Sequence, residues 1–170
     1  HVPALIVHAM AVMRMCALLG LVSLAAGTND FGKKFLAENA EKEGVVVLPS
    51  GLQYKVLRKG TGDSHPTASS PCKVHYEGRV AQKYPDGEKF DSSYDRGSPT
   101  TFAPNQVIKG WTEAMQLMVE GDKWEMFIPS ELAYGERGFP GRIGAGDVLV
   151  FTMEILEILG GKVPASKDEV

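Results

Sequence analysis

The chain has 170 residues, of which 44% are hydrophobic, and its 18 basic and 21 acidic residues give a net charge of -3. This length suits one domain with an extension and is too short for two full domains. Because acidic and basic residues are interspersed, we expect neither a nucleic acid nor an anionic membrane surface as a partner.

Residues 1–27 have the pattern of a secretory signal peptide. Arg14 precedes an apolar run at 15–26 that ends in small residues. The run is about half of the roughly 20 residues that a helix needs to span a bilayer, so we expect no membrane span and a secreted protein. A retained helix packed on the domain and leftover cloning sequence are the alternatives. Removal of residues 1–27 would leave Cys72 as the only cysteine, which excludes an intramolecular disulfide.

A short helix with a linker is expected next, at residues 28–47. Asn29 and Asp30 can cap a helix that runs from about 31 to 43, and Gly44 suits its C-terminal end. Its apolar side consists of Phe31, Phe35 and Leu36. We interpret the helix as a lead-in packed beside the domain, with a dimer contact as the alternative. A monomer is therefore expected, and a dimer stays open.

Apolar and polar residues alternate in four segments of the main domain, which we place at 48–160. The segments are 52–56, 72–76, 124–128 and 149–155. A period of two residues is typical of half-buried antiparallel strands. Trp111, Met115 and Met118 instead recur at the spacing of a helix that lays one face on a sheet. The sequence therefore predicts an α+β fold in which a twisted antiparallel sheet wraps around one short helix.

Loops and a tail complete the chain. Pro and Gly are frequent at 96–105 and 135–147, and loops of this kind at the mouth of a sheet can form the walls of a pocket. Residues 161–170 are expected to form a polar, frayed tail.

Three separated segments combine aromatic and aliphatic side chains with one acid and one phenol. They are Phe90-Asp91-Ser92-Ser93, then Val-Ile-Lys-Gly-Trp at 107–111, and Ile-Pro-Ser-Glu-Leu-Ala-Tyr-Gly at 128–135. No Gly-x-Ser-x-Gly, His-Glu-x-x-His, Cys-x-x-Cys or Gly-rich phosphate loop accompanies them. We therefore expect no metal and no cofactor. The combination suits bond rotation better than bond cleavage.

In order and spacing, these segments resemble the FKBP-type peptidyl-prolyl cis/trans isomerases, and within them the macrophage infectivity potentiator (Mip) group. The resemblance extends over about 51–159 and implies an FKBP-like fold. It also implies an enzyme that accelerates rotation about Xaa-Pro bonds in peptides and proteins, and that binds tacrolimus- or rapamycin-like macrolides in the same pocket. A role in infection is a further implication of the Mip group.

The resemblance assigns roles to eleven residues. Those near the reacting bond would be Asp91, Tyr134 and Tyr76. Those in contact with substrate or macrolide would be Phe90, Arg96, Val107, Ile108, Trp111, Phe139, Ile143 and Phe151. On this view Trp111 forms the pocket floor, Tyr134 donates its hydroxyl to a substrate carbonyl, and Asp91 sits at the rim.

Structural alternatives stay open for these residues. Trp111 and Tyr134 could be ordinary core, and Asp91 could cap a turn. The chain also departs from the family pattern: Thr100 stands where phenylalanine is common, and Gly144-Ala145 stands where two prolines are common. These departures are expected to alter substrate preference and macrolide affinity. The alternative function is a non-catalytic module or chaperone that binds Pro-containing peptides.

Overall fold

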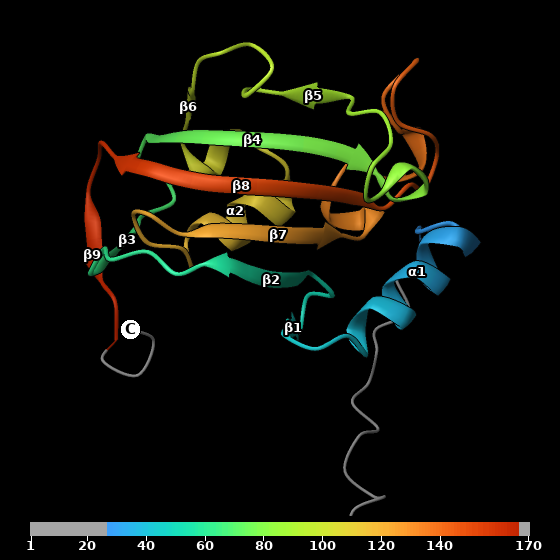
Figure 1. Ribbon diagram of the computed structural model, residues 1–170, viewed down its shortest axis with the longest axis horizontal. Helices are drawn as coiled ribbons and strands as arrows, with labels where there is room; N and C mark the ends of the chain where they lie inside the picture. The colour runs from blue at the N-terminus through green and yellow to red at the C-terminus, as the bar shows by residue number, and fades with distance from the viewer. Residues whose placement is uncertain (1–26, 167–170) are drawn as a thin grey trace, which may run out of the picture.

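The computed structural model describes residues 27–166 (Figure 1). The signal-peptide-like segment predicted for residues 1–27 lies, apart from Gly27, outside these residues. Between residues 27 and 166, no helix has the length and apolar character that crossing a bilayer requires.

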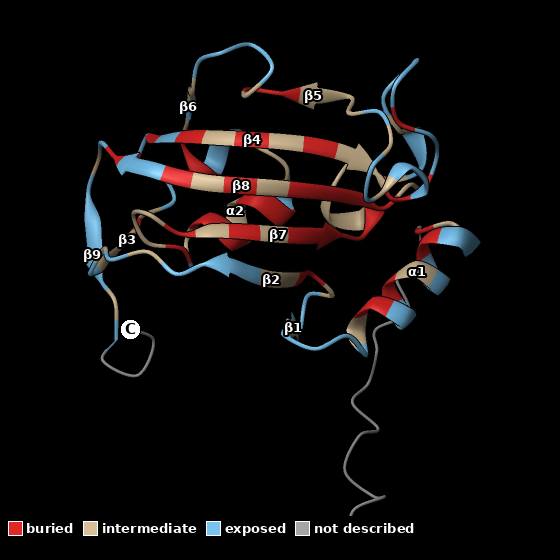
Figure 2. Cartoon of the chain, in the orientation of Figure 1, coloured by how far each residue is buried: buried red, intermediate tan, exposed pale blue. Residues whose placement is uncertain are grey.

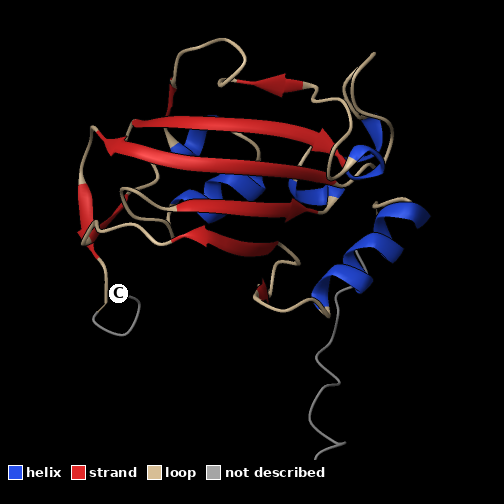
Figure 3. Ribbon diagram, viewed as in Figure 1, coloured by secondary structure: helices blue, strands red, loops and turns tan. Residues whose placement is uncertain are grey.

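An antiparallel sheet is the framework of the domain (Figures 1 and 3). In the part of the chain that the structure describes, it contains seven strands in the order β1-β2-β7-β8-β4-β5, and β6 also pairs with β4. They are β1 (Val45–Val47), β2 (Gln53–Arg58), β4 (Cys72–Val80), β5 (Asp91–Ser92), β6 (Thr100–Phe102), β7 (Lys123–Ile128) and β8 (Leu149–Ile158). The two longest strands, β4 and β8, pair at its centre from Val80↔Leu149 to Cys72↔Ile158.

Short helices connect and cover these strands. The α-helices are α1 (Asp30–Ala40) and α2 (Lys109–Met115), and single 3-10 turns are η1 (Ala81–Lys83), η2 (Pro104–Gln106), η3 (Ser130–Leu132) and η4 (Gly135–Arg137). The helix α2 lies across one face of the sheet (Figure 1). This arrangement confirms the predicted fold, an antiparallel sheet around a short helix.

The main core lies between α2 and the sheet. Trp111 and Met115 are buried on α2, as their spacing predicts. Met118 is also fully buried but lies beyond the last residue of the helix. The N–H of Met118 still donates to the carbonyl of Ala114 at 3.1 Å, so the chain keeps helical geometry for one more turn. The helical spacing therefore correctly identified the buried side, although it extended the helix too far.

The strands β7 and β8 are buried on both faces at one end, which the alternation did not predict (Figure 2). Phe127 and Val150 are register partners that point away from α2, and they are 1% and 4% exposed. They form a second cluster with Leu36 of α1, and the Phe35 ring lies 6.0 Å from the Phe127 ring. The helix α1 therefore covers this end of the sheet.

The ends of α1 differ in part from the prediction. Asn29 caps the helix, because its side chain accepts a hydrogen bond from the N–H of Gly32. The helix ends at Ala40 and not near residue 43, and Gly44, at φ 78°, makes the turn into β1. Phe31, expected on the apolar side, is 50% exposed. α1 thus packs beside the domain through Leu36 and Phe35.

The predicted frayed tail is partly wrong. Lys162–Pro164 forms β9, which pairs with β3 (Ser64–Pro66) in a separate two-stranded sheet. The backbone of this segment gains a strand partner that its composition does not reveal. The alternation at 52–56 also fails at one residue: Val56 is 44% exposed, and the pairing of β2 with β7 shifts register directly after it, between Val56 and Arg58.

We predict that Leu36→Ala lowers the free energy of unfolding by about 2 to 3 kcal/mol, because it removes a buried side chain from the contact between α1 and the sheet. Phe31→Ala on the exposed side of the same helix is the control, with an expected loss below about 1 kcal/mol. Urea unfolding of both variants measures the difference. Equal losses would contradict the packing of α1 on the sheet.

Candidate functional site

A cavity of about 420 Å³ opens between the start of α2 and the segment before it, the β4–β8 pair, the start of β5 and the loop that follows β7. Its lining residues are Tyr76, Phe90, Asp91, Phe102, Gln106, Val107, Ile108, Trp111, Tyr134 and Phe151. Most of these side chains are apolar or aromatic. A concave apolar surface with a few polar groups is the usual form of a small-molecule or peptide site.

Trp111 connects the cavity to the core. Its side chain is 4% exposed and belongs to the main hydrophobic cluster. The rings of Tyr76 and Phe151 lie edge-on to it, at centroid distances of 4.9 and 5.0 Å. Edge-to-face aromatic contacts of this kind stabilise a fixed ring orientation.

Two glycines allow this close packing. A Cβ on Gly110 of α2 would lie 2.6 Å from Cγ2 of Ile128, so only glycine lets the helix approach β7 this closely. A Cβ on Gly78 of β4 would lie 2.4 Å from the ring of Phe151 and 2.8 Å from that of Phe90. Glycine at this point of β4 therefore leaves room for the two rings that form one wall of the cavity.

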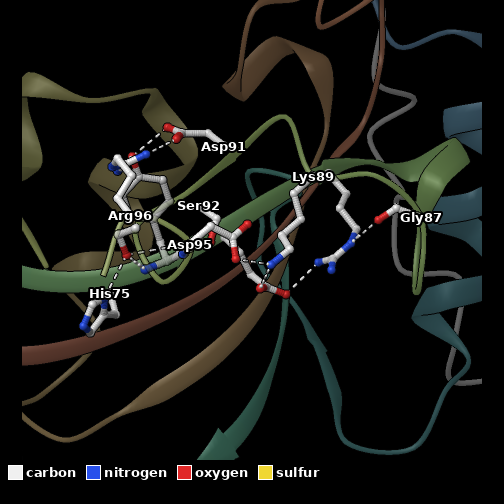
Figure 4. A network of polar contacts seen from close by, with 11 residues as sticks. His75, Gly87, Lys89, Asp91, Ser92, Asp95 and Arg96 are labelled. Atoms are coloured by element: carbon white, nitrogen blue, oxygen red, sulfur yellow. Dashed lines mark hydrogen bonds and ion pairs between the residues drawn. The ribbon is translucent and has the colours of Figure 1, made fainter. Parts of the chain in front are cut away.

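The polar rim of the cavity consists of Tyr76, Asp91 and Arg96. The Tyr76 hydroxyl donates to Oδ2 of Asp91 at 2.7 Å, and Arg96 donates to Oδ1 of Asp91 and to the Tyr76 hydroxyl, the latter at 2.9 Å. Figure 4 shows the guanidinium of Arg96 directed at the Asp91 carboxylate. Each oxygen of Asp91 thus has a donor.

These contacts set the protonation of the rim. Burial by itself raises the pKa of Asp91, but the hydrogen bonds from Tyr76 and Arg96 and the positive charge of Arg96 outweigh it and lower that pKa. Burial, followed by the hydrogen bond to Asp91, raises the pKa of Tyr76. At neutral pH Asp91 is therefore ionised and Tyr76 protonated. Neither is poised to exchange a proton near pH 7.

Further polar contacts hold the segment 91–96 against β4. The hydroxyl of Ser93 accepts from the N–H of Tyr76 at 2.8 Å and contacts Nδ1 of His75 at 2.9 Å. Lys89 pairs with both Asp95 and Glu77 (Figure 4). The contacts of Lys89 and Ser93, which come before and after Asp91 in the sequence, therefore help to hold Asp91 in place.

The structure brings most of the predicted site residues to this cavity, but three do not line it. Arg96 does not line the cavity but donates to two residues that do, Asp91 and Tyr76. The ring of Phe139 is 47% exposed and packs edge-on against Tyr134 at 5.9 Å. Ile143 is 7% exposed and belongs to the main hydrophobic cluster.

Two lining residues, Phe102 and Gln106, were missed by the sequence analysis. Phe102 lies in β6, whose three residues are too few to show a period of two, and its ring lies 5.9 Å from that of Trp111. An aromatic residue inside a Pro- and Gly-rich loop was the available signal. The side chain of Gln106 accepts from the N–H of Ala103 at 3.0 Å. Nothing in the sequence pattern distinguishes this glutamine.

In residues 27–166, no group of three or more His, Cys, Asp or Glu side chains could hold a metal ion. The free cysteine of this part of the chain, Cys72, is buried, and burial raises the pKa of its thiol to about 11. It is therefore a neutral core residue at physiological pH.

Comparison with protein families gives two matches. Residues 62–156 match the model of the FKBP-type peptidyl-prolyl cis-trans isomerases. Residues 21–56 match a domain that is amino-terminal to such isomerases.

Known proteins resemble the chain over most of its length. A macrophage infectivity potentiator of Trypanosoma cruzi is 46% identical over 139 residues, which are 82% of this chain and 69% of that protein. The isomerase FkpA of Aeromonas hydrophila is 55% identical over 75% of this chain and 45% of its own length. The outer membrane protein MIP of Legionella longbeachae is 46% identical over 75% of this chain and 52% of its own. The chain thus spans about half the length of these two bacterial relatives.

Among solved structures, that of FkpA from Escherichia coli is similar with a TM-score of 0.70 and 38% identity. The similarity covers 76% of this chain and 58% of the FkpA chain.

We predict that Arg96→Gln raises the pKa of Asp91 toward its ordinary value, because the variant loses the positive charge beside the carboxylate. The lowered pKa means that ionised Asp91 favours the folded state above its unfolded pKa, and that this contribution is lost as the pH falls through the folded pKa. In the variant the folded pKa lies closer to the unfolded one, so the contribution is smaller and its loss is complete at a higher pH. NMR titration of the carboxyl carbons measures the pKa of Asp91. The pKa of Asp95, which the hydrogen bond from Lys89 lowers, is the internal control. An unchanged Asp91 pKa would refute the assignment of Arg96.

Proposed function

The chain belongs to the FKBP-type peptidyl-prolyl cis-trans isomerases, and on that premise we propose that its cavity accelerates rotation about Xaa-Pro bonds in peptides and proteins. The observation that carries this proposal is the composition of the cavity. Its walls are aromatic and aliphatic, and its two rim groups Asp91 and Tyr76 have pKa values that are displaced away from neutrality.

Such a cavity suits the physical demands of the reaction. Rotation about an amide meets a barrier of about 18 to 20 kcal/mol, because the planar amide loses conjugation as it twists. A catalyst must bind the twisted amide more tightly than the planar one, by about 1.4 kcal/mol for each tenfold in rate. The twisted amide is less dipolar than the planar form and loses less on leaving water. An apolar cavity therefore favours it without a nucleophile or a proton relay.

We assign the following roles within the cavity. The indole of Trp111 supports the proline ring of the substrate, since a rigid aromatic surface binds it at a low entropic cost. The hydroxyl of Tyr134, which is 40% exposed, donates to a substrate carbonyl. The N–H of Ile108, at the N-cap of α2, holds a second carbonyl. The carboxylate of Asp91 stands beside the rotating carbonyl.

Macrolides of the tacrolimus and rapamycin type would occupy the same cavity and compete with peptides. The two departures from the family pattern lie near its edge. Thr100 accepts a hydrogen bond from Arg96 at 3.4 Å, and Gly144 stands directly beyond Ile143 in the loop that carries Phe139. We propose that these residues alter substrate preference and macrolide affinity and leave the floor and the rim in place.

We further propose an extracytoplasmic, secreted protein in which residues 48–160 form the isomerase domain. The leader pattern of residues 1–27 supports export, and one relative is named an outer membrane protein. The name of the trypanosomal relative supports a role in infection. We propose a monomer, because Leu36 and Phe35 of α1 pack against the chain's own sheet.

The test is NMR exchange on a short Xaa-Pro peptide with wild-type protein and with Asp91→Ala and Tyr134→Phe. We expect the wild type to accelerate exchange and rapamycin to abolish the effect. Each variant should lose about fivefold in rate, the equivalent of roughly one hydrogen bond of 1 kcal/mol. Asp86→Ala and Tyr94→Phe, which lie outside the cavity, are the matched controls. Binding of peptide without any acceleration would favour the non-catalytic module instead.

A further inference from the structure

A short segment before α1 joins both ends of the loop that carries Tyr134. We call residues 27–29 the N-terminal strap and residues 129–148 the Tyr134 loop. We propose that Thr28 in this strap is a positioning residue, which holds the loop so that Tyr134 stands at the edge of the cavity. The proposal rests on the proposed function and adds a structural requirement to it.

The first end of the loop is held by Glu131. Its carboxylate accepts hydrogen bonds from the N–H groups of Gly27 and Thr28 and from the hydroxyl of Thr28, the last at 2.9 Å. The hydroxyl of Thr28 also accepts from the N–H of Ser130 at 3.1 Å. Thr28 is 2% exposed and Ser130 is fully buried. Hydrogen bonds to a carboxylate are stronger than those between neutral groups, so this contact fixes the chain just before Tyr134.

The second end of the loop is held by Asn29. Its N–H donates to the carbonyl of Gly146 at 2.9 Å, and its side-chain amide donates to Asp147 at 2.8 Å. The N–H of Gly146 in turn donates at 3.0 Å to the carbonyl of Gly135, which directly follows Tyr134. The strap therefore lies between the start and the end of the loop and bonds to both.

The space between strap and loop is closely filled. Gly146 has φ 69°, and a Cβ at this residue would lie 2.6 Å from the carbonyl oxygen of Gly27 and 2.8 Å from the nitrogen of Asn29. A residue other than glycine would be strained there and would also push the strap away. The close approach indicates that strap and loop are fitted to one another.

The body of the loop depends on such anchors. It contains four glycines with positive φ, at 135, 138, 141 and 146, and glycine carries a high entropic cost of ordering. Its two aromatic residues, Tyr134 and Phe139, are 40% and 47% exposed, so burial alone does little to hold them. Apart from the burial of Ile143 in the main cluster, we therefore expect bonds at the base of the loop to supply the order that Tyr134 needs.

The strap also joins the loop to α1. The side chain of Asn29 caps this helix through the N–H of Gly32 at 2.9 Å while its amide group holds Asp147. A displacement of α1 would therefore act on the Tyr134 loop through Asn29, in addition to the cluster that Leu36 forms with Val148. The proposed cavity and the N-terminal helix are in this way mechanically coupled.

The first test is hydrogen exchange measured on the full chain with Thr28→Val, which keeps the shape of the side chain and removes the hydroxyl. We expect amides at 132–146 to exchange at least about fivefold faster, the effect of roughly one lost hydrogen bond. Amides of β4 and β8 should keep their rates. Thr28→Ser restores the hydroxyl and should behave as the wild type. Thr61→Val, an exposed threonine outside the strap, is the matched control.

Unchanged exchange at 132–146 in Thr28→Val would overturn the proposal. An equal acceleration in β4 and β8 would overturn it as well, because it would mean that Thr28 stabilises the whole domain and not the loop.

The second test combines Thr28→Val with Tyr134→Phe in the peptide-exchange assay. A positioning residue lowers kcat/KM about fivefold when the Tyr134 hydroxyl is present and has little effect when it is absent. Equal losses in both backgrounds would contradict the role of Thr28 in placing Tyr134. If the wild type fails to accelerate exchange, the proposed function is wrong, while hydrogen exchange still decides whether the strap holds the loop.

Discussion

The edge-to-face packing of Trp111 against Tyr76 and Phe151 is the contact on which the fold and the cavity both depend. Because β4 and β8 pair through Gly78↔Phe151 and Tyr76↔Met153, the two rings come from neighbouring strands and meet the helix from the same side. The face of α2 that completes the core thus also presents the floor of the cavity. A floor that is part of a close-packed core cannot shift without disturbing that core. In the proposed function, a bound peptide would meet this rigid apolar surface, as selective binding of a twisted amide requires.

The hydrogen bonds and ion pairs at the rim add to this rigidity. Asp91, Tyr76 and Arg96 satisfy one another, and the contacts of Ser93 and Lys89 extend the bonding along β4. These bonds fix the orientation of the carboxylate, so in the proposed function it would not need to reorganise during rotation. The proposed role of the strap of residues 27–29 would give the Tyr134 side of the cavity a comparable anchor. Both polar sides of the cavity thus depend on bonds made outside it.

The spacing of apolar residues predicted the strands and the helix whose buried face is set by the backbone geometry of one segment. The alternation at 149–155 and the spacing of Trp111 and Met115 identified the buried faces of β8 and α2, because a side chain's direction repeats with the backbone. The burial of Phe127 could not be predicted in this way, since it requires α1 to return over the sheet from a distant part of the sequence. The same applies to β9, which gains its order only from β3. Phe102 and the bonds of Thr28 to Glu131 likewise arise from long-range contacts, and the segments that carry them are too short for periodicity.

In the proposed function the cavity favours a twisted amide through its shape and fixed dipoles, without transferring a proton. The most direct test is kcat/KM for peptide exchange in H2O and D2O between about pH 5 and 9, a window that lies between the lowered pKa of Asp91 and the raised pKa of Tyr76. The account predicts a solvent isotope ratio close to unity and a flat pH profile across this window. A ratio of about twofold or more, or a bell-shaped profile, would show that a proton moves in the rate-limiting step and would contradict it.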